Sequence, residues 1–219
     1  MIVAIDGPAG SGKSAVGERV AAAMGLRFVD SGLMYRAIAW LAARRRIPFD
    51  DERALTELAE SVPIRIDGRG VEAGGEDLTA HVYGAEASEG ASRVARVAGV
   101  RAALVRQQRQ LGDGGVVMAG RDIGTVVFPD TPHKIYLTAS VDERARRRAR
   151  QIEARGREAD EAALRREVEE RDRRDSERAA SPLRAAADAA VLCTDGLDLS
   201  QVVTAVLNQV RASGGRGRG

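Results

Sequence analysis

The 219-residue chain has few of the features that mark secreted or membrane-spanning proteins. Its one cysteine, Cys193, cannot form an internal disulfide, which favours a reducing, cytoplasmic setting. It has no run of about 18 apolar residues, the length that a membrane-spanning helix needs. Residues 1–6 predict a buried strand rather than a signal peptide, because no basic segment precedes a longer apolar stretch. We therefore expect a cytoplasmic protein with no membrane partner, and we expect Cys193 to be a small core residue.

Lysine and asparagine are scarce, and the chain has no strong net charge. Lys13 and Lys134 are the only lysines among 34 basic residues, so 32 are arginines, and 32 acidic residues leave a formal net charge of +2. This balance is not that of a dedicated nucleic-acid-binding protein, so we expect no nucleic-acid partner. Asn208, the only asparagine, lies near the carboxyl end, which excludes the Asn-Lys-x-Asp segment with which GTPases read guanine.

Short apolar segments alternate with helical patterns along the chain, as they do in a parallel sheet covered by helices. The predicted helices include one that carries an apolar stripe of Met34, Ala37, Ile38 and Leu41. The predicted strands are residues 2–6, 27–30, 115–119, 134–139 and 189–194, and the predicted helices are about 12–24, 31–45 and 160–178. The pattern predicts an α/β domain with a five-stranded parallel sheet flanked by helices.

Residues 63–98 interrupt this alternation. They are rich in Gly and contain only brief alternating apolar stretches, which predicts a small antiparallel insert followed by short helices. The tail, residues 213–219, has no apolar residue and is predicted to be disordered. We predict one domain over residues 1–212, with its core in 1–62, 99–141 and 179–212, the insert at about 63–98 and a lid region at about 142–178.

The segment GPAGSGKS, residues 7–14, follows the first predicted strand and precedes a predicted helix. It matches GxxxxGK[ST], in which glycines let backbone N–H groups approach phosphate oxygens and the helix adds its positive end. Lys13 would neutralise the outer phosphates, and the Ser14 hydroxyl would bind Mg²⁺ as the metal ligand. The residues expected to bind ATP are Gly7, Pro8, Ala9, Gly10, Ser11, Gly12, Lys13, Ser14 and Ala15. We call residues 7–14 the phosphate loop.

Two further segments place arginines where a second ligand could bind. In DSGLMYR, Ser31 begins a helix and Arg36 lies opposite its apolar stripe, so both can face a cleft. Arg121 and Asp122 follow the strand 115–119 directly, at the end of a parallel sheet where ligands bind. On these residues alone, Ser31 could also be an ordinary helix cap with Arg36 as a surface charge, and Arg121 and Asp122 could form a local ion pair.

The predicted helix at 160–178 changes character along one face. Leu164 and Val168 begin an apolar stripe, which continues in Arg171, Asp175 and Arg178. Such a face borders a polar cavity, or else it is a solvated stripe with internal ion pairs. The arginine-dense residues 142–157 are either a mobile lid that excludes water from a transferring phosphoryl group, or a solvated helix face.

Four segments together resemble the bacterial cytidylate kinase family of P-loop nucleoside monophosphate kinases. They are IDGPAGSGKS, DSGLMYRA, GRDIGTVVFPD and RDRRDSERAASPL. The segments occur in the same order as in the family, and the match extends over nearly the full chain. The resemblance implies a P-loop NTPase core with an NMP-binding insert and an arginine-rich lid. It also implies direct in-line transfer of a phosphoryl group from ATP to CMP and dCMP with Mg²⁺ as cofactor. We expect no obligatory protein partner and a monomer.

The resemblance also implies a role for each site residue. The implied CMP-binding residues are Ser31, Arg36 and Arg121 at the α-phosphate, Ser92, Arg101 and Asp122 at the cytosine edge, and Arg171, Asp175 and Arg178 at ribose and phosphate. The implied catalytic residues are Lys13, Arg121, Arg171 and Arg178. One position departs from the family pattern, because Ala119 stands where relatives usually carry an acidic residue before GRDIG. We expect that carboxylate to orient arginines or Mg²⁺-bound water in relatives, so its absence changes the surroundings of the metal.

Two other functions stay open on the residues alone. The first is a P-loop kinase for another small acceptor, such as UMP, AMP or shikimate, which Ser92, Arg101 and Asp122 would not be built to read. The second is a nucleotide-dependent RNA-binding ATPase that uses the arginines of residues 144–157. It predicts salt-sensitive RNA binding and ATP hydrolysis without any acceptor.

Overall fold

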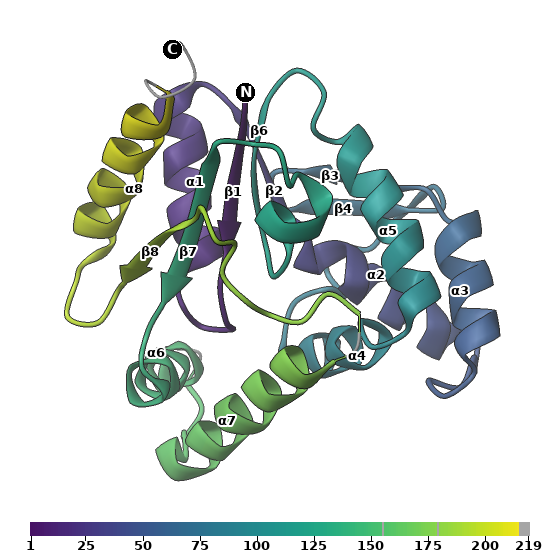
Figure 1. Cartoon of the computed structure of the whole chain (residues 1–219). Helices are drawn as coiled ribbons and strands as arrows, with labels where there is room; N and C mark the ends of the chain where they lie inside the picture. Colours follow the sequence, from purple (N-terminus) through teal and green to yellow (C-terminus); the bar gives the residue numbers. More distant parts are fainter. Residues whose placement is uncertain (155, 179, 215–219) are drawn as a thin grey trace.

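The computed structural model describes residues 1–154, 156–178 and 180–214. Its centre is a five-stranded sheet in the order β2-β6-β1-β7-β8, in which all neighbouring strands are parallel (Figure 1). The strands are β1 (Ile2–Asp6), β2 (Arg27–Asp30), β6 (Val116–Gly120), β7 (His133–Thr138) and β8 (Ala190–Cys193). The predicted parallel sheet is confirmed, with strand ends within one residue of those expected.

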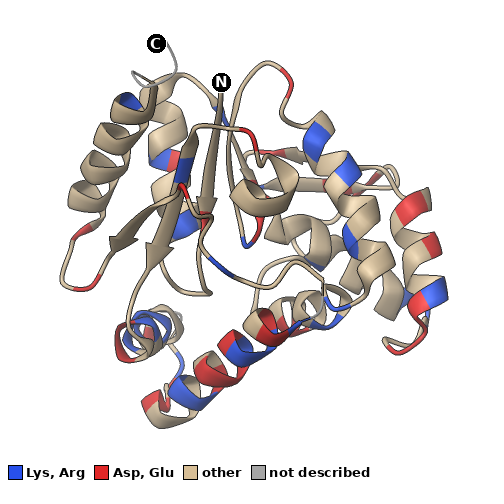
Figure 2. Ribbon diagram, viewed as in Figure 1, with Lys and Arg blue, Asp and Glu red and all other residues tan. Residues whose placement is uncertain are grey.

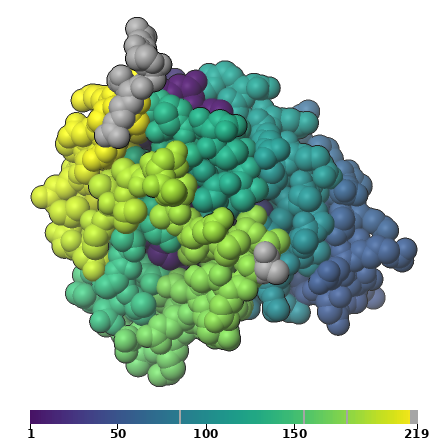
Figure 3. Space-filling view, in the orientation of Figure 1, coloured from purple at the N-terminus to yellow at the C-terminus, as the bar shows by residue number. Residues whose placement is uncertain are grey.

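The side chains of β1 point alternately to the two faces of the sheet, and both faces are covered by helices. Val3 and Ile5 pack in one apolar cluster with helices α1 (Lys13–Met24) and α8 (Leu199–Gly214), while Ala4 faces the other cluster. In the space-filling view, later parts of the chain cover almost all of the purple N-terminal segment (Figure 3). The central strand is therefore buried on both faces, as expected for a parallel sheet.

On the second face, three helices on the right of Figure 1 share one apolar cluster with the sheet. They are α2 (Gly32–Arg44), α3 (Glu52–Ser61) and α5 (Ala98–Gln110). The predicted stripe of α2 is buried, with Met34, Ala37 and Ile38 fully shielded from solvent. The predicted helices did not include α3, α5 or α8.

Residues 63–98 form a three-stranded antiparallel sheet followed by a helix. The strands are β3 (Ile64–Asp67), β4 (Gly70–Ala73) and β5 (Glu76–Asp77), and the helix is α4 (Ala85–Val94). Ile64, Ile66 and Val71 point into the same apolar cluster as α2 and α5. The predicted antiparallel insert is confirmed, and it shares its core with the main sheet.

The arginine-rich region forms two helices, α6 (Val141–Glu153) and α7 (Glu161–Glu177), which pack on each other below the sheet in Figure 1. Ala145, Ala149 and Leu164 make a small apolar contact between them. Basic and acidic residues mix along both helices (Figure 2), and several form ion pairs such as Arg148–Glu167. The helix predicted over 160–178 is confirmed.

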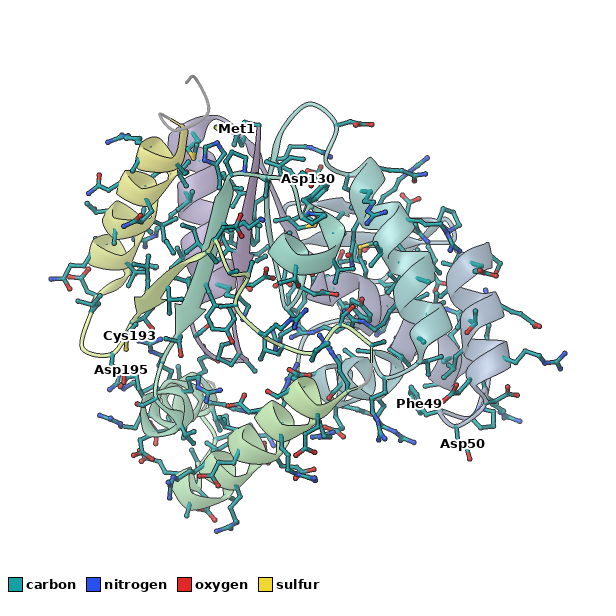
Figure 4. All side chains as sticks on the ribbon, viewed as in Figure 1. Met1, Phe49, Asp50, Asp130, Cys193 and Asp195 are labelled. Carbon is teal, nitrogen blue, oxygen red and sulfur yellow. The ribbon has the colours of Figure 1, made fainter. Side chains whose placement is uncertain are left out.

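Two expectations differ from the structure. Cys193 is exposed, because Val191 and Cys193 face away from the covering helices on the edge strand β8, near the labelled Asp195 (Figure 4). Helix α8 continues to Gly214, two residues into the predicted tail, where the Ser213 hydroxyl lies 2.6 Å from His133 Nδ1. Residues 215–219 lie outside the described residues. In the described ranges, no helix is long and apolar enough to cross a membrane.

Candidate functional site

A cavity of about 1020 Å³ opens where the carboxyl ends of the strands meet. The phosphate loop, the ends of β2 and β6, and helices α4, α6 and α7 line its wall. The predicted site residues that line it are Ala9, Gly10, Ser11, Gly12, Lys13, Ser14, Ala15, Ser31, Arg36, Ser92, Arg101, Arg121, Asp122, Arg171, Asp175 and Arg178. The exceptions are Gly7 and Pro8. Segments separated by more than 150 positions in the sequence therefore share one wall.

The phosphate loop turns directly into helix α1. Gly12, with φ +92°, begins the helix without a side chain that could cap it, so the first N–H groups of α1 are available for an anion. Gly7 has a packing role instead, because a Cβ atom there would lie 2.0 Å from the Leu137 carbonyl oxygen. This close approach to β7 explains a glycine at a position that does not line the cavity.

Lys13 is buried under the loop that it belongs to. Its Nζ donates to the Pro8 carbonyl oxygen at 2.6 Å and lies 3.4 Å from Ser11 Oγ. Burial, followed by the positive charge of Arg121, holds the pKa of Lys13 well below its usual value. A phosphate anion beside Nζ would favour the charged ammonium, so phosphate binding would raise the pKa of Lys13.

Two neighbouring residues link the end of β2 to the rest of the site. Ser14 Oγ donates to Asp30 Oδ2 at 2.6 Å, and Asp30 Oδ1 accepts a hydrogen bond from Gly32 N at 2.9 Å. The Ser31 hydroxyl donates to the Ala119 carbonyl oxygen at 2.9 Å instead of capping α2. The ordinary helix-cap alternative for Ser31 is therefore wrong, and Asp30, which the sequence analysis did not select, makes the side-chain contact at the start of α2.

The three residues expected at the cytosine edge come together. Arg101 and Asp122 form a buried ion pair, with side chains 4% and 5% exposed, and Ser92 is buried beside the same cavity. Among the described residues, Ser92 Oγ and Arg101 Nε have no hydrogen-bond partner. Buried polar atoms nearly always have partners, so these two are suited to a polar ligand.

Tyr35 belongs to the same group, although the sequence analysis did not select it. The Arg101 guanidinium lies over its ring, 5.4 Å from the centroid. Burial raises the pKa of Tyr35 to about 12, so its hydroxyl stays protonated. The signal was present in the segment DSGLMYR, but an aromatic residue on the apolar side of a helix predicts core packing first.

A second group of arginines surrounds one carboxylate. Arg121 Nε donates to Asp175 Oδ2 at 2.9 Å, and Arg178 Nη1 lies 3.9 Å from Asp175 Oδ1. Burial, followed by the charge of Arg121, lowers the pKa of Arg171 to about 10. Arg36 is held by a hydrogen bond to the Val82 carbonyl oxygen at 3.0 Å. Positive charge exceeds negative charge here, which suits an anionic ligand.

Arginines of α6 hold the lid region against the phosphate loop. Arg144 is 3% exposed and donates from Nη1 to the Ala9 carbonyl oxygen at 3.2 Å and to Asp172 Oδ1 of α7 at 2.9 Å. Arg147 donates to Thr194 Oγ1 at 2.9 Å. These side chains are fixed by partners within the chain, so for them the solvated-face alternative is wrong.

One buried carboxylate joins the phosphate loop to the loop that carries Arg121 and Asp122. Asp6 accepts hydrogen bonds from Ile123 N at 2.8 Å and from Gly124 N at 2.7 Å. Burial raises its pKa from 3.8 to about 6. Asp6 was not selected from the sequence, because an acid at the end of a strand does not show which distant amides it accepts from.

The chain is similar to known proteins over nearly its whole length. A family model described as "Cytidylate kinase" matches residues 3–212. A protein named "Cytidylate kinase" from Desulforamulus reducens is 44% identical over 212 residues, which are 95% of this chain and 96% of that protein. A "Bifunctional pantoate ligase/cytidylate kinase" from Synechococcus sp. (strain JA-3-3Ab) is 47% identical over 218 residues, which are 96% of this chain. The chain spans 40% of the length of that bifunctional relative.

Proposed function

The chain belongs to the cytidylate kinase family of nucleoside monophosphate kinases, and we propose that it phosphorylates CMP and dCMP with Mg²⁺-ATP. The observation that carries the proposal is one cavity with two differently built ends. One end is the phosphate loop with Lys13, and the other is the buried Arg101–Asp122 pair beside Ser92. The arginine cluster around Asp175 lies on the same wall.

ATP would bind at the phosphate-loop end. The free N–H groups at the start of α1 and the Lys13 ammonium would bind its phosphates. Ser14 Oγ would provide an oxygen atom of the kind that Mg²⁺ prefers, and the adjacent Asp30 carboxylate accepts the hydrogen of this hydroxyl. Among the described residues, no group of three or more acidic, His or Cys side chains could hold a metal alone, so the ion would come with the phosphates. When bound, Mg²⁺ would neutralise charge on the phosphate oxygens.

The acceptor nucleotide would bind at the other end. Asp122 would accept a hydrogen bond from the exocyclic amino group of cytosine, while Ser92 and Arg101 would complete the contacts to its edge. Uracil carries a carbonyl at the position of that amino group, and its oxygen would face the Asp122 carboxylate. The site therefore favours cytosine over uracil by repulsion as well as by attraction.

The reaction needs little covalent chemistry from the protein. An α-phosphate oxygen of CMP is already a nucleophile, so it would attack the γ-phosphorus while the bond from that phosphorus to the bridging oxygen of ADP breaks. Lys13, Arg121, Arg171 and Arg178 would neutralise charge as it moves between the two nucleotides. Helices α6 and α7 would exclude water and so limit ATP hydrolysis.

The alternative of an RNA-binding ATPase loses its main support. It needs free arginines in residues 144–157, and three of them, Arg144, Arg147 and Arg148, are already paired with Asp172, Thr194 and Glu167. RNA binding would be left to the exposed arginines of this segment, such as Arg150.

A coupled assay of ADP release tests the proposal directly. Mg²⁺-ATP is offered with CMP, dCMP, UMP, AMP or no acceptor. We expect strong turnover with CMP and dCMP, weak turnover with UMP and AMP, and almost none without acceptor. Equal ADP release without acceptor would support the ATPase alternative. A preference for AMP would support the alternative of a P-loop kinase for another small acceptor.

A further inference from the structure

Strand β6 contributes no carboxylate to the phosphate loop. In many P-loop proteins, Mg²⁺ is held by the hydroxyl of the loop together with an aspartate from a strand. Here β6, the neighbour of β1 on one side, ends in Ala119 and Gly120. If Mg²⁺ is to have an aspartate beside it in this protein, that aspartate must come from another element.

Asp30 is placed to supply it. It is the last residue of β2 and pairs in register with Ala119 of β6. The Asp30 carboxylate therefore lies on the strand next to the alanine methyl group. Asp30 Oδ2 accepts the Ser14 hydroxyl hydrogen at 2.6 Å. A hydroxyl that donates its hydrogen to a carboxylate keeps its lone pairs available for a cation.

The negative charge of Asp30 lies beside the loop that is expected to bind phosphate. A carboxylate beside a phosphate-binding loop repels a triphosphate, and this repulsion is strong when water is partly excluded. A divalent cation between the two anions changes repulsion into attraction. The second oxygen of Asp30 is held by Gly32 N at 2.9 Å, which keeps the carboxylate facing Ser14.

We propose that Asp30 is the carboxylate of the metal site, orienting the Ser14 hydroxyl and accepting a hydrogen bond from metal-bound water. This inference rests on the proposed function, since it assumes that the phosphate loop binds a metal–nucleotide complex.

Mn²⁺ serves as the probe, and its binding to the full chain is followed by electron paramagnetic resonance in the presence of ADP. For Asp30→Asn, we expect the affinity for Mn²⁺ to fall by roughly tenfold or more. The affinity for ADP without metal should stay equal or rise, because a negative charge beside the phosphates is lost. A merely structural role would weaken both. An unchanged Mn²⁺ affinity in Asp30→Asn overturns the proposal.

Glu18→Gln is the matched control. Glu18 also lines the cavity, one helical turn after Ser14, but its carboxylate is paired with Arg69 at 2.9 Å. The same change of charge should leave Mn²⁺ affinity within about twofold of the wild type. Asp30→Asn combined with Ala119→Asp should recover part of the lost affinity, because the register places a carboxylate beside the same site.

These measurements distinguish a failure of the proposed function from a failure of the role of Asp30. If the wild-type chain binds no Mn²⁺ even with ADP, the proposed function fails. If the wild type binds Mn²⁺ and Asp30→Asn binds it equally, only the role of Asp30 fails. If Asp30→Asn does not fold, the wild type labelled with ¹³C at its aspartate carboxyl groups should show a ¹³C hyperfine coupling to bound Mn²⁺, and its absence overturns the proposal.

Discussion

At the residue scale, the buried Arg101–Asp122 pair bears on both base recognition and the stability of the folded chain. Taking two charges out of water is costly, and removing one partner leaves the other charge uncompensated. Both side chains face the cavity, and Arg101 Nε has no partner among the residues that the structure describes. The pair is therefore better explained by ligand recognition than by stability alone.

Asp122→Asn keeps the size of this side chain and removes its charge. We expect kcat/KM for CMP to fall by about 100-fold, the loss of a charged hydrogen bond, while KM for ATP stays within about twofold. The preference for CMP over UMP should narrow, because an amide can donate to the uracil carbonyl. Steady-state kinetics with each acceptor measures these effects.

Asp113→Asn is the control, because Asp113 lies exposed in a turn and undergoes the same chemical change. It should leave both substrates unaffected. A loss of ATP and CMP binding in equal proportion in Asp122→Asn would contradict a role in reading the base. Urea unfolding of both variants shows whether the folded state has been preserved.

At the element scale, helix α6 contacts the phosphate loop through one buried arginine. Arg144 joins three segments, since it donates to the Ala139 and Ala9 carbonyl oxygens and pairs with Asp172 of α7. Its Cβ atom also lies close to Gly10, where an added Cβ would be 3.2 Å away. The position of the lid region and the shape of the loop are therefore linked through one side chain.

Arg144→Met keeps the aliphatic stem and removes the guanidinium. We expect KM for ATP to rise roughly tenfold, because the loop loses a hydrogen bond worth about 1 kcal/mol and Asp172 loses its partner. KM for CMP should change less, since Arg144 contacts no residue assigned to the base. Kinetics with each substrate varied in turn separates the two effects.

Arg146→Met tests the specificity of this result. Arg146 lies on the same helix but is half exposed, 3.6 Å from Glu143, and exposed pairs contribute little. It should behave as the wild type. If both variants raise KM for ATP equally, the loss reflects the overall charge of α6 and not the contact with the loop.

At the scale of the whole molecule, Asp6 connects stability to pH. Its pKa is raised by burial from 3.8 to about 6, so the folded chain binds a proton more tightly than the unfolded chain between about pH 4 and pH 6. Protonation therefore favours folding, and the contribution of Asp6 to the free energy of unfolding falls as the pH rises through this window. This direction is opposite to that of a salt-bridged carboxylate.

Comparison with Asp6→Asn isolates this effect. The wild-type free energy of unfolding, minus that of the variant, should fall by about 2 kcal/mol from pH 4 to pH 7. Urea unfolding at steps across this range measures the difference, in which the titration of other carboxylates cancels. A difference that is flat or rises with pH would show that Asp6 is not a buried group with a raised pKa.

Much of the fold followed from local pattern. The strand segments, the helix stripe of α2 and the antiparallel insert are visible because apolar spacing reports which face is buried. Helix α8 was missed although Val202, Val206 and Val210 recur at helical spacing, and all three are buried. Cys193 was misplaced because an apolar segment does not reveal whether its strand lies at the centre or at the edge of a sheet.

The sequence by itself determined the phosphate loop, the strands of the sheet and the apolar face of α2, because these depend on short motifs and on periodicity. Only the tertiary structure decided what Asp6, Asp30 and Arg144 contact. Their partners Gly124, Ser14 and Ala9 lie 118, 16 and 135 positions away. Such contacts exist only after parallel strands bring their carboxyl ends to one edge, and no local pattern records which side chains meet there.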